Sequence, residues 1–261
     1  MNLDLRGKRA VVGGSTQGIG KASAMELALL GATVTLLARN EESLKAVVKE
    51  LPTPTAQQHD YLLADFSNPD QLNGVIDKFV SNHIVHILIN NTGGPPAGLA
   101  IDASPEDFIK AFNSHLICNQ ILVKAVVPGM KQSAFGRIIN IISTSVKIPL
   151  KGLGVSNTIR GAVANWAKTI SVELAPFGIT VNNVLPGSTM TGRLDSLIKS
   201  KAVKSGRTYD EEKKLMVEEV PAGRICEPHE VAAAVAFLAS PAAAYINGIN
   251  IPVDGGRTGS L

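Results

Sequence analysis

A glycine-rich stretch near the start of the chain has the residue types and the spacing to bind a phosphate group. Residues 11–20 read VVGGSTQGIG, between an apolar run and an amphipathic pattern. At a strand-to-helix turn, Gly14 permits a tight bend, Gly18 lets the backbone approach a pyrophosphate, and Gly20 lets helix and strand pack closely. The helix N-terminus favours the anion. The pattern predicts a dinucleotide site, with a structural glycine turn as the alternative.

No other stretch offers a comparable cofactor or metal site. The histidines outside the long central helix are not joined by acids or thiols at metal-ligand spacing; they are His59, His83, His86 and His229. Zinc and similar ions need such a cluster. We therefore predict no metal.

Length and charge narrow the class of protein. The chain has 261 residues, 45% apolar and 4% aromatic, which fits one large domain spanning residues 1–261. Lysine and arginine number 25 against 22 acidic residues, and the basic residues form no concentrated run. We therefore predict no nucleic-acid partner.

Targeting signals and cysteines point to a cytoplasmic protein. Residues 1–8 are too polar for a signal peptide, and no run of about eighteen apolar residues follows, so no membrane partner is expected. Cys118 and Cys226 lie in apolar patterns expected to be helical and have no C-x-x-C partner. They are predicted to be buried free thiols in a reducing compartment.

Apolar runs and helical patterns alternate along the chain. Seven runs are expected to be strands: 9–12, 33–38, 57–64, 85–90, 137–142, 180–185 and 250–253. The patterns between them are expected to be helices: 21–30, a charged helix ending at 50, 69–81, 105–131, 158–174 and 228–239. Continuous apolar strands indicate an α/β fold, a doubly wound, mostly or wholly parallel sheet of about seven strands buried on both faces.

One segment breaks the alternation. Residues 188–220 are polar and charged, and Gly192 and Gly206 interrupt them. Long insertions of this kind often cover a binding site. We predict a helical lid, with a solvated surface excursion as the alternative.

Over residues 6–256 the chain resembles the short-chain dehydrogenase/reductase family. The matching motifs follow successive expected strands: the glycine loop, Asp65-Phe66, Asn90-Asn91-Thr92-Gly93, Ser143, Pro186-Gly187 with Thr191, and Val253-Asp254-Gly255-Gly256. The resemblance implies a single Rossmann domain that binds NAD(P) at the carboxyl ends of its strands. Open parallel sheets bind ligands at the same edge.

The resemblance also assigns cofactor contacts, position by position. Residues of the loop would wrap the pyrophosphate: Ser15, Thr16, Gln17 and Ile19. Asp65 and Phe66 would bracket the adenine, and Asn91 and Gly93 would lie along the ribose. The nicotinamide carboxamide would be addressed just after Pro186 and Gly187, by Thr189 and Thr191.

The residue after the second expected strand bears on the choice of cofactor. An acidic residue there would accept hydrogen bonds from the adenosine 2′-hydroxyl and repel a 2′-phosphate. This chain has Arg39, whose planar cation suits a phosphate. We predict NADP(H) in preference to NAD(H), although Gln17 stands where the family often has a second basic residue. A surface ion pair with Glu41 or Glu42 is the alternative role for Arg39.

The catalytic pattern of the family is largely replaced. The family uses a serine, a Tyr-x-x-x-Lys pair and an asparagine from the preceding long helix. Ser143 matches, but an ungapped comparison puts Ser156 at the tyrosine position, Arg160 at the lysine position and His115 at the asparagine position. Of the three tyrosines, only Tyr209 precedes a lysine by four residues, and it lies in the expected lid, where a surface helix turn is the better interpretation.

These substitutions change the available proton chemistry. A tyrosine can be tuned by a nearby cation toward neutrality, whereas the hydroxyl of Ser156 is far less acidic. Arg160 keeps the positive charge and can stabilise an oxyanion, yet an arginine does not release its proton. His115 is the candidate proton relay, unless it is a packed structural histidine.

Two functions follow. The first is an NADP(H)-dependent oxidoreductase for a small ketone or secondary alcohol, resembling 3-oxoacyl-carrier-protein reductases, with an atypical catalytic site. The second is a nucleotide-binding scaffold or redox sensor that kept the fold and lost the chemistry. The resemblance further implies a homotetramer or homodimer built through the helices at 105–131 and 158–174.

Overall fold

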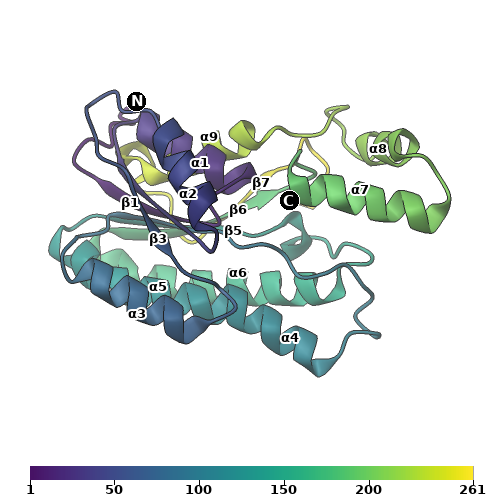
Figure 1. The fold of residues 1–261 in the computed structure, drawn as a ribbon, viewed down its shortest axis with the longest axis horizontal. Coiled ribbons are helices and arrows are strands. Elements are labelled where there is room, and N and C mark those ends of the chain that lie inside the picture. The colour runs from purple at the N-terminus through teal and green to yellow at the C-terminus, as the bar shows by residue number, and fades with distance from the viewer. Residues whose placement is uncertain (261) are drawn as a thin grey trace.

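The computed structural model describes residues 1–260, and a seven-stranded sheet runs through its centre (Figure 1). All strand pairs are parallel, as the sequence predicted, and the strand order is β3-β2-β1-β4-β5-β6-β7. The strands are β1 (Arg9–Gly13), β2 (Thr33–Ala38), β3 (Asp60–Leu63), β4 (Ile87–Asn90), β5 (Gly136–Ile141), β6 (Ile179–Pro186) and β7 (Asn250–Val253).

Helices cover both faces of the sheet, and two more project from it. The helices are α1 (Gly18–Leu29), α2 (Glu41–Glu50), α3 (Pro69–Val80), α4 (Pro105–Phe112), α5 (Cys118–Gln132), α6 (Gly154–Leu174), α7 (Gly192–Ser205), α8 (Tyr209–Glu218) and α9 (Pro228–Ala239). In Figure 1, α1, α2 and α9 lie on one face and α3, α5 and α6 on the other. Within residues 1–260, no helix combines the length and hydropathy needed to span a membrane.

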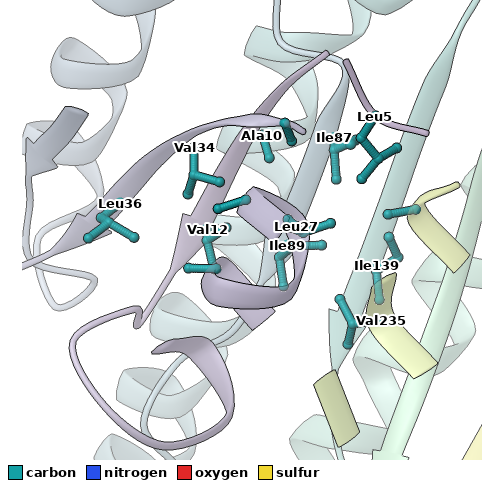
Figure 2. Close-up of a cluster of buried hydrophobic side chains, with 14 of the residues drawn as sticks. Leu5, Ala10, Val12, Leu27, Val34, Leu36, Ile87, Ile89, Ile139 and Val235 are labelled. Carbon is teal, nitrogen blue, oxygen red and sulfur yellow. The ribbon is translucent and has the colours of Figure 1, made fainter. Parts of the chain in front are cut away.

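Burial on both faces explains why the strands read as unbroken apolar runs. On β4, Ile87 and Ile89 pack with α1 and α9, whereas Leu88 between them packs with α3 and α5. Figure 2 shows the first of these clusters, with Leu27 of α1 and Val235 of α9 against the sheet. When helices cover a parallel sheet on both sides, neither face meets water, so polar and apolar residues do not alternate along its strands.

The strand order reverses beside β1, and this reversal defines the ligand edge of the sheet. The chain runs outward from β1 through β2 to β3, then crosses back to β4 on the other side of β1. The loops after β1 and β4 therefore diverge at the carboxyl end of the sheet. Open α/β sheets bind ligands in the crevice that forms there.

A ladder of asparagines fixes the register of the strands just below this edge. The strands β4 to β7 place four of them directly opposite one another: Asn90, Asn140, Asn183 and Asn250. The Nδ2 of each of the first three donates to the Oδ1 of the next residue in this series, at 2.8 Å. A one-residue slip would break every bond of the ladder, so the loops beyond it are held in a fixed relative position.

Several predicted boundaries need correction. The third strand begins at Asp60 and not at residue 57, because the side chains of Gln57 and His59 bond the backbone of the neighbouring α1–β2 segment instead. The expected helix 105–131 is interrupted by a π-helical turn at Asn113–Ile117. Helix α1 starts three residues earlier than expected and α6 four residues earlier.

The segment 188–220 forms two helices, α7 and α8, joined at Gly206. They share a small apolar core of their own that includes Leu194, Ile198 and Met216. In Figure 1 they extend away from the sheet on the side where its strands end. The prediction for Cys226 was wrong in two respects: it is only half-buried, and it lies before α9 in a bridge with Thr189, whereas Cys118 is buried in α5 as expected.

Candidate active site

The structure brings the sequence-predicted cofactor residues to one edge of the sheet. They follow the carboxyl ends of β1, β2, β3, β4 and β6 in turn: Gly14, Ser15, Thr16, Gln17, Gly18, Ile19 and Gly20; Arg39; Asp65 and Phe66; Asn91 and Gly93; and Pro186 at the end of β6 with Gly187, Thr189 and Thr191. Because the strands are parallel, these ends share one side of the molecule.

Two glycines of the loop leave no space for a side chain. A Cβ on Gly20 would lie 2.2 Å from the carbonyl oxygen of Gly14, and one on Gly14 would lie 2.7 Å from the carbonyl oxygen of Asn91. Gly14 also has a left-handed φ of 55°. These neighbours are backbone atoms that cannot move aside, so the turn requires glycine at both positions. Backbone N–H groups and the start of α1 are thus left open to a ligand, which is the geometry a diphosphate needs.

Side chains of the loop and of β4 hold this turn in place. Asn91 donates from Nδ2 to the carbonyl oxygens of Gly13 and Gly14, both at 3.2 Å. The buried Ser15 accepts a hydrogen bond from the Leu37 N–H at 3.1 Å. Both side chains are therefore hydrogen-bonded within the protein and hold the turn in place.

The first residues of α7 face the glycine loop from the opposite side. A Cβ on Gly18 would lie 3.1 Å from Cγ2 of Thr191, and one on Gly192 would lie 3.6 Å from Oε1 of Gln17. Thr191 caps α7 by accepting from the Leu194 N–H. The lid is therefore anchored directly over the predicted diphosphate site.

Arg39 is exposed at the end of β2 and faces Asp65 across the strand ends. Asp65 has a lowered pKa, chiefly because it accepts a hydrogen bond from the Ser67 N–H, with a smaller contribution from the charge of Arg39. The alternative ion pair of Arg39 with Glu41 or Glu42 is not found: Glu41 pairs with Lys45, and Arg39 is in none of the ion pairs within residues 1–260. The cation is free to meet a phosphate.

His115 lies in the π-helical turn between α4 and α5, and its side chain is only 3% exposed. A π turn widens the helix, and such turns often occur at functional sites. The ring Nδ1 shares a hydrogen bond with Oγ1 of Thr92, in the loop after β4. Burial, and then the charge of Arg160, lower the His115 pKa to about 3, so its imidazole is neutral at physiological pH.

Arg160 is a buried cation without a carboxylate partner. It lies on α6 and donates from NH1 to the carbonyl oxygen of Ile141, the last residue of β5, at 3.0 Å. None of the ion pairs within the described residues includes it. Burial, and then the charge of Arg193, lower its pKa to about 10, so the guanidinium keeps its charge at neutral pH.

The two predicted serines flank this cation. Ser143 follows β5 by two residues, and its Oγ accepts from the Ser145 N–H at 3.1 Å. Ser156 is half-buried on α6, four residues before Arg160 and hence on the same face of the helix. The four predicted catalytic positions therefore come from β5, α6 and the π turn.

Sequence reasoning missed Arg193, which also reaches this region. It lies at the start of α7, and its NH2 donates to the carbonyl oxygen of Pro95, in the loop after β4. A Cβ on Gly94 would lie 3.8 Å from the NH2 atoms of both Arg193 and Arg160. One signal was available in the sequence: a cation in the first turn of a helix opposes the helix dipole and so invites a functional explanation.

The tyrosines lie elsewhere. Tyr61 bonds Glu41 at the far edge of the sheet, and Tyr245 is fully exposed after α9. Tyr209 is on α8 in the lid core, where burial and Asp195 raise its pKa. A catalytic phenol needs a lowered pKa, so the Tyr209 and Lys213 spacing fits the surface-helix interpretation.

A cavity of about 560 Å³ opens beside the catalytic positions. It is lined by the loop after β4, including Gly94, and by α4, together with His115 and Val155. A second cavity, of about 660 Å³, lies on the outer side of the glycine loop between α1, α7 and α9, away from Arg160. Residues 1–260 hold no group of three His, Cys, Asp or Glu side chains that could bind a metal ion.

Known proteins resemble this chain along almost its whole length. A family model described as enoyl-(acyl carrier protein) reductase matches residues 14–258. The NADPH-dependent reductase BacG of Bacillus subtilis is 31% identical, with 97% of this chain and 99% of that protein covered. The 3-oxoacyl-[acyl-carrier-protein] reductase FabG of Vibrio cholerae is 34% identical, with 97% and 98% covered. L-Sorbose reductase of Gluconobacter frateurii, solved with NADPH and L-sorbose, superposes with a TM-score of 0.93 at 27% identity over 100% of both chains.

Proposed function

The chain belongs to the short-chain dehydrogenase/reductase family of oxidoreductases, and from that premise we propose that it reduces the carbonyl group of a small ketone with NADPH. The names of two similar proteins support this choice, because 3-oxoacyl-[acyl-carrier-protein] reductase and L-sorbose reductase both describe reduction of a carbonyl group. The loop that Gly14 and Gly20 make possible fits a dinucleotide diphosphate, and Arg39 fits its 2′-phosphate. When bound, NADPH supplies the hydride.

The observation that carries the proposal is the buried cation at the end of β5. Reduction places negative charge on the carbonyl oxygen, and a cation held in a water-poor site stabilises that charge strongly. Arg160 is buried and permanently charged, and its bond to Ile141 fixes its position beside Ser143. We assign the stabilisation of the oxyanion to Arg160, with Ser143 and Ser156 as hydrogen-bond donors to the same oxygen.

The alcohol product also requires a proton. Arg160 does not release its proton, and His115 is already neutral at neutral pH, so neither residue is the source of the proton. A neutral imidazole can still donate from one nitrogen while it accepts at the other. We propose that Thr92 and His115 pass a proton from solvent toward Ser156, so that the serine hydroxyl relays it to the product oxygen.

The proposal is tested by anaerobic incubation with NADPH and a panel of 3-oxoacyl thioesters, diketones and quinones, following the loss of nicotinamide absorbance. We expect turnover of at least one carbonyl compound. Absence of turnover across the panel, with NADPH binding intact, would favour the alternative of a nucleotide-binding scaffold or redox sensor, which rests on the three substituted catalytic positions.

A matched pair of serine variants sharpens the assay. Ser143→Ala should lower kcat/KM about 10- to 100-fold, because a hydrogen bond to the developing oxyanion is lost. Ser145→Ala, two residues away, removes a buried hydroxyl that has no hydrogen-bond partner within residues 1–260, and it should leave kcat/KM unchanged. Equal losses in both variants would mean that the loop, and not the Ser143 hydroxyl, matters.

Assembly and location remain predictions. The family resemblance implies a homotetramer or homodimer, and sedimentation velocity of the purified chain would distinguish these from a monomer. The cytoplasm remains the expected compartment.

A further inference from the structure

Two guanidinium groups from different elements converge on one glycine. Arg160 comes from α6 and Arg193 from the lid helix α7, and the NH2 atoms of both lie 3.8 Å from the Cβ position of Gly94. At this separation the charge of Arg193 contributes, after burial, to the lowered pKa of Arg160. No ion pair within residues 1–260 joins either arginine to a carboxylate.

Such an arrangement is unfavourable without an anion. Each guanidinium has five N–H donors, and the structure gives Arg160 one acceptor, the carbonyl oxygen of Ile141. Arg160 is 8% exposed, so water reaches its remaining donors poorly. Like charges close together in a region of low dielectric repel one another, and an unpaired buried charge is costly. A bound anion would remove both penalties.

The cavity beside Gly94 indicates what kind of ligand carries the anionic group. Gly94 and Pro95 line the 560 Å³ cavity, together with apolar residues such as Ala97, Leu99 and Val155 and the charged residues Asp102, Asp107 and Lys110. A ligand held at Gly94 would therefore place its charged end between the arginines and extend its body into the cavity. Planar guanidinium groups match the two oxygens of a carboxylate.

We propose that Arg193 and Arg160 form a carboxylate-binding subsite, and that the substrate is an oxo acid whose carboxylate lies close to the reacting carbonyl. This inference rests on the proposed function, since it names the substrate class for the same site. Arg193 acts here as a specificity-determining residue. It also donates to the carbonyl oxygen of Pro95 and so connects α7 to the loop after β4. The same side chain would therefore bind the carboxylate and hold the lid in position.

The diphosphate of the cofactor is the competing anion. It has its own donors at the glycine loop and the start of α1, whereas Gly94 belongs to the loop after β4. The 2′-phosphate has Arg39 at the end of β2. Measurement of NADPH affinity in each variant below separates the two anions.

The test compares 3-oxobutanoate with its methyl ester, in which a methyl group on the carboxyl oxygen removes the negative charge. Isothermal titration of the protein saturated with NADP⁺ measures binding without turnover, because the oxidised cofactor has no hydride to give. We expect the acid to bind on the order of 10- to 100-fold more tightly than the ester, as charge-assisted hydrogen bonds predict. With NADPH, kcat/KM should favour the acid by a similar factor.

Two variants remove the subsite in different ways. Arg193→Gln should reduce the preference for the acid to within about threefold, because neutral hydrogen bonds give little charge selectivity. Gly94→Ala should do the same, since a methyl group there would contact both NH2 atoms at an ordinary 3.8 Å and occupy the space of the anion. Lys201→Gln on the same helix is the control and should keep the preference, because Lys201 is exposed and does not line the cavity.

The outcomes separate this inference from the proposed function. Tight binding of the acid that depends on Arg193, without turnover, would support the subsite and contradict the reductase. Turnover of carbonyl compounds with equal affinity for acid and ester would overturn the subsite and leave the reductase standing. The subsite is also overturned if Arg193→Gln weakens NADPH binding as much as it weakens binding of the acid.

Discussion

The glycine loop and the reaction centre share one edge of the sheet but depend on different properties of the sequence. The loop relies on the absence of side chains: a Cβ on Gly20 would lie 2.2 Å from a backbone oxygen. The reaction centre relies on the identity of side chains that arrive from α6, α7 and the π turn, namely Arg160, Arg193 and His115. A backbone cradle tolerates little change, whereas a set of side chains can be exchanged while the fold is kept. This difference would allow the loop to follow the family pattern beside the catalytic substitutions that we propose at Ser156, Arg160 and His115.

The largest effect is expected when a side chain is added to the glycine loop. Gly20→Ala should weaken NADPH binding at least on the order of 100-fold and lower the free energy of unfolding by about 2–4 kcal/mol, because backbone atoms must move. Denaturant unfolding and NADPH fluorescence titration measure both effects. Gly74→Ala, in α3, is the matched control: a Cβ there would meet nothing within 4 Å, so the change should stabilise the helix by up to about 1 kcal/mol. Similar behaviour of the two variants would contradict the steric account.

The next effect separates catalysis from stability. Arg160→Met removes a buried charge that has no carboxylate partner, so kcat/KM should fall about 100-fold while the melting temperature stays equal or rises. Steady-state kinetics and thermal unfolding on the same samples check this. Arg160→Lys should retain more activity than Arg160→Met, because a cation remains. A large loss of stability in Arg160→Met would mean that the arginine is chiefly structural.

His115 is expected to have a smaller effect, on the free energy of unfolding, within a defined pH range. Its pKa is about 3 when folded and near 6.5 when unfolded, so below pH 6.5 the unfolded chain binds a proton that the native protein does not. The stability that neutral His115 contributes is therefore complete above pH 6.5 and is lost as the pH falls toward 3, at up to about 1.4 kcal/mol per pH unit. Denaturant unfolding of wild type and His115→Asn between pH 7 and 4.5 measures the difference. Parallel curves would show that His115 is not held neutral.

Arg39 is expected to give the smallest effect, because its side chain is exposed. Arg39→Ala should weaken NADPH binding about 10-fold through loss of a charge-assisted contact with the 2′-phosphate, and NADH binding should not change. Lys45→Ala, a nearby surface cation paired with Glu41, is the control. Unchanged NADPH affinity in Arg39→Ala would refute the assignment.

The sequence predicted the fold better than the site for physical reasons. Strand β2 and helix α9 begin and end where their apolar patterns do, because burial in the core of a two-sided sheet dictates both composition and length. The π turn at Asn113–Ile117 has no such pattern, since one extra residue in a helical turn alters packing and leaves local propensity unchanged. The third strand was overestimated because Gln57 and His59 look compatible with a strand but bond backbone elsewhere.

Within the site, local features were predictable and convergent ones were not. The positions of Ser143, Ser156 and Arg160 followed from spacing along one continuous stretch. Arg193 lies close to Arg160 only because α7 folds back toward the loop after β4. The hydrogen bond from Arg193 to Pro95 shows this fold, since it joins residues that are 98 positions apart along the chain. No local pattern encodes such a meeting. Likewise, the neutral state of His115 depends on burial, which the sequence did not reveal.

The central claim is that a permanent cation and a neutral histidine replace the titrating phenol of the family. The pH dependence of kcat/KM, measured between pH 6 and 9 with a carbonyl substrate that has no ionisable group, tests it most directly. His115 titrates near pH 3 and Arg160 near pH 10, so the account predicts a flat profile for the wild type across this range. The double variant Ser156→Tyr with Arg160→Lys should show an ionisation within it. An ionisation between pH 6 and 9 in the wild type would contradict the claim.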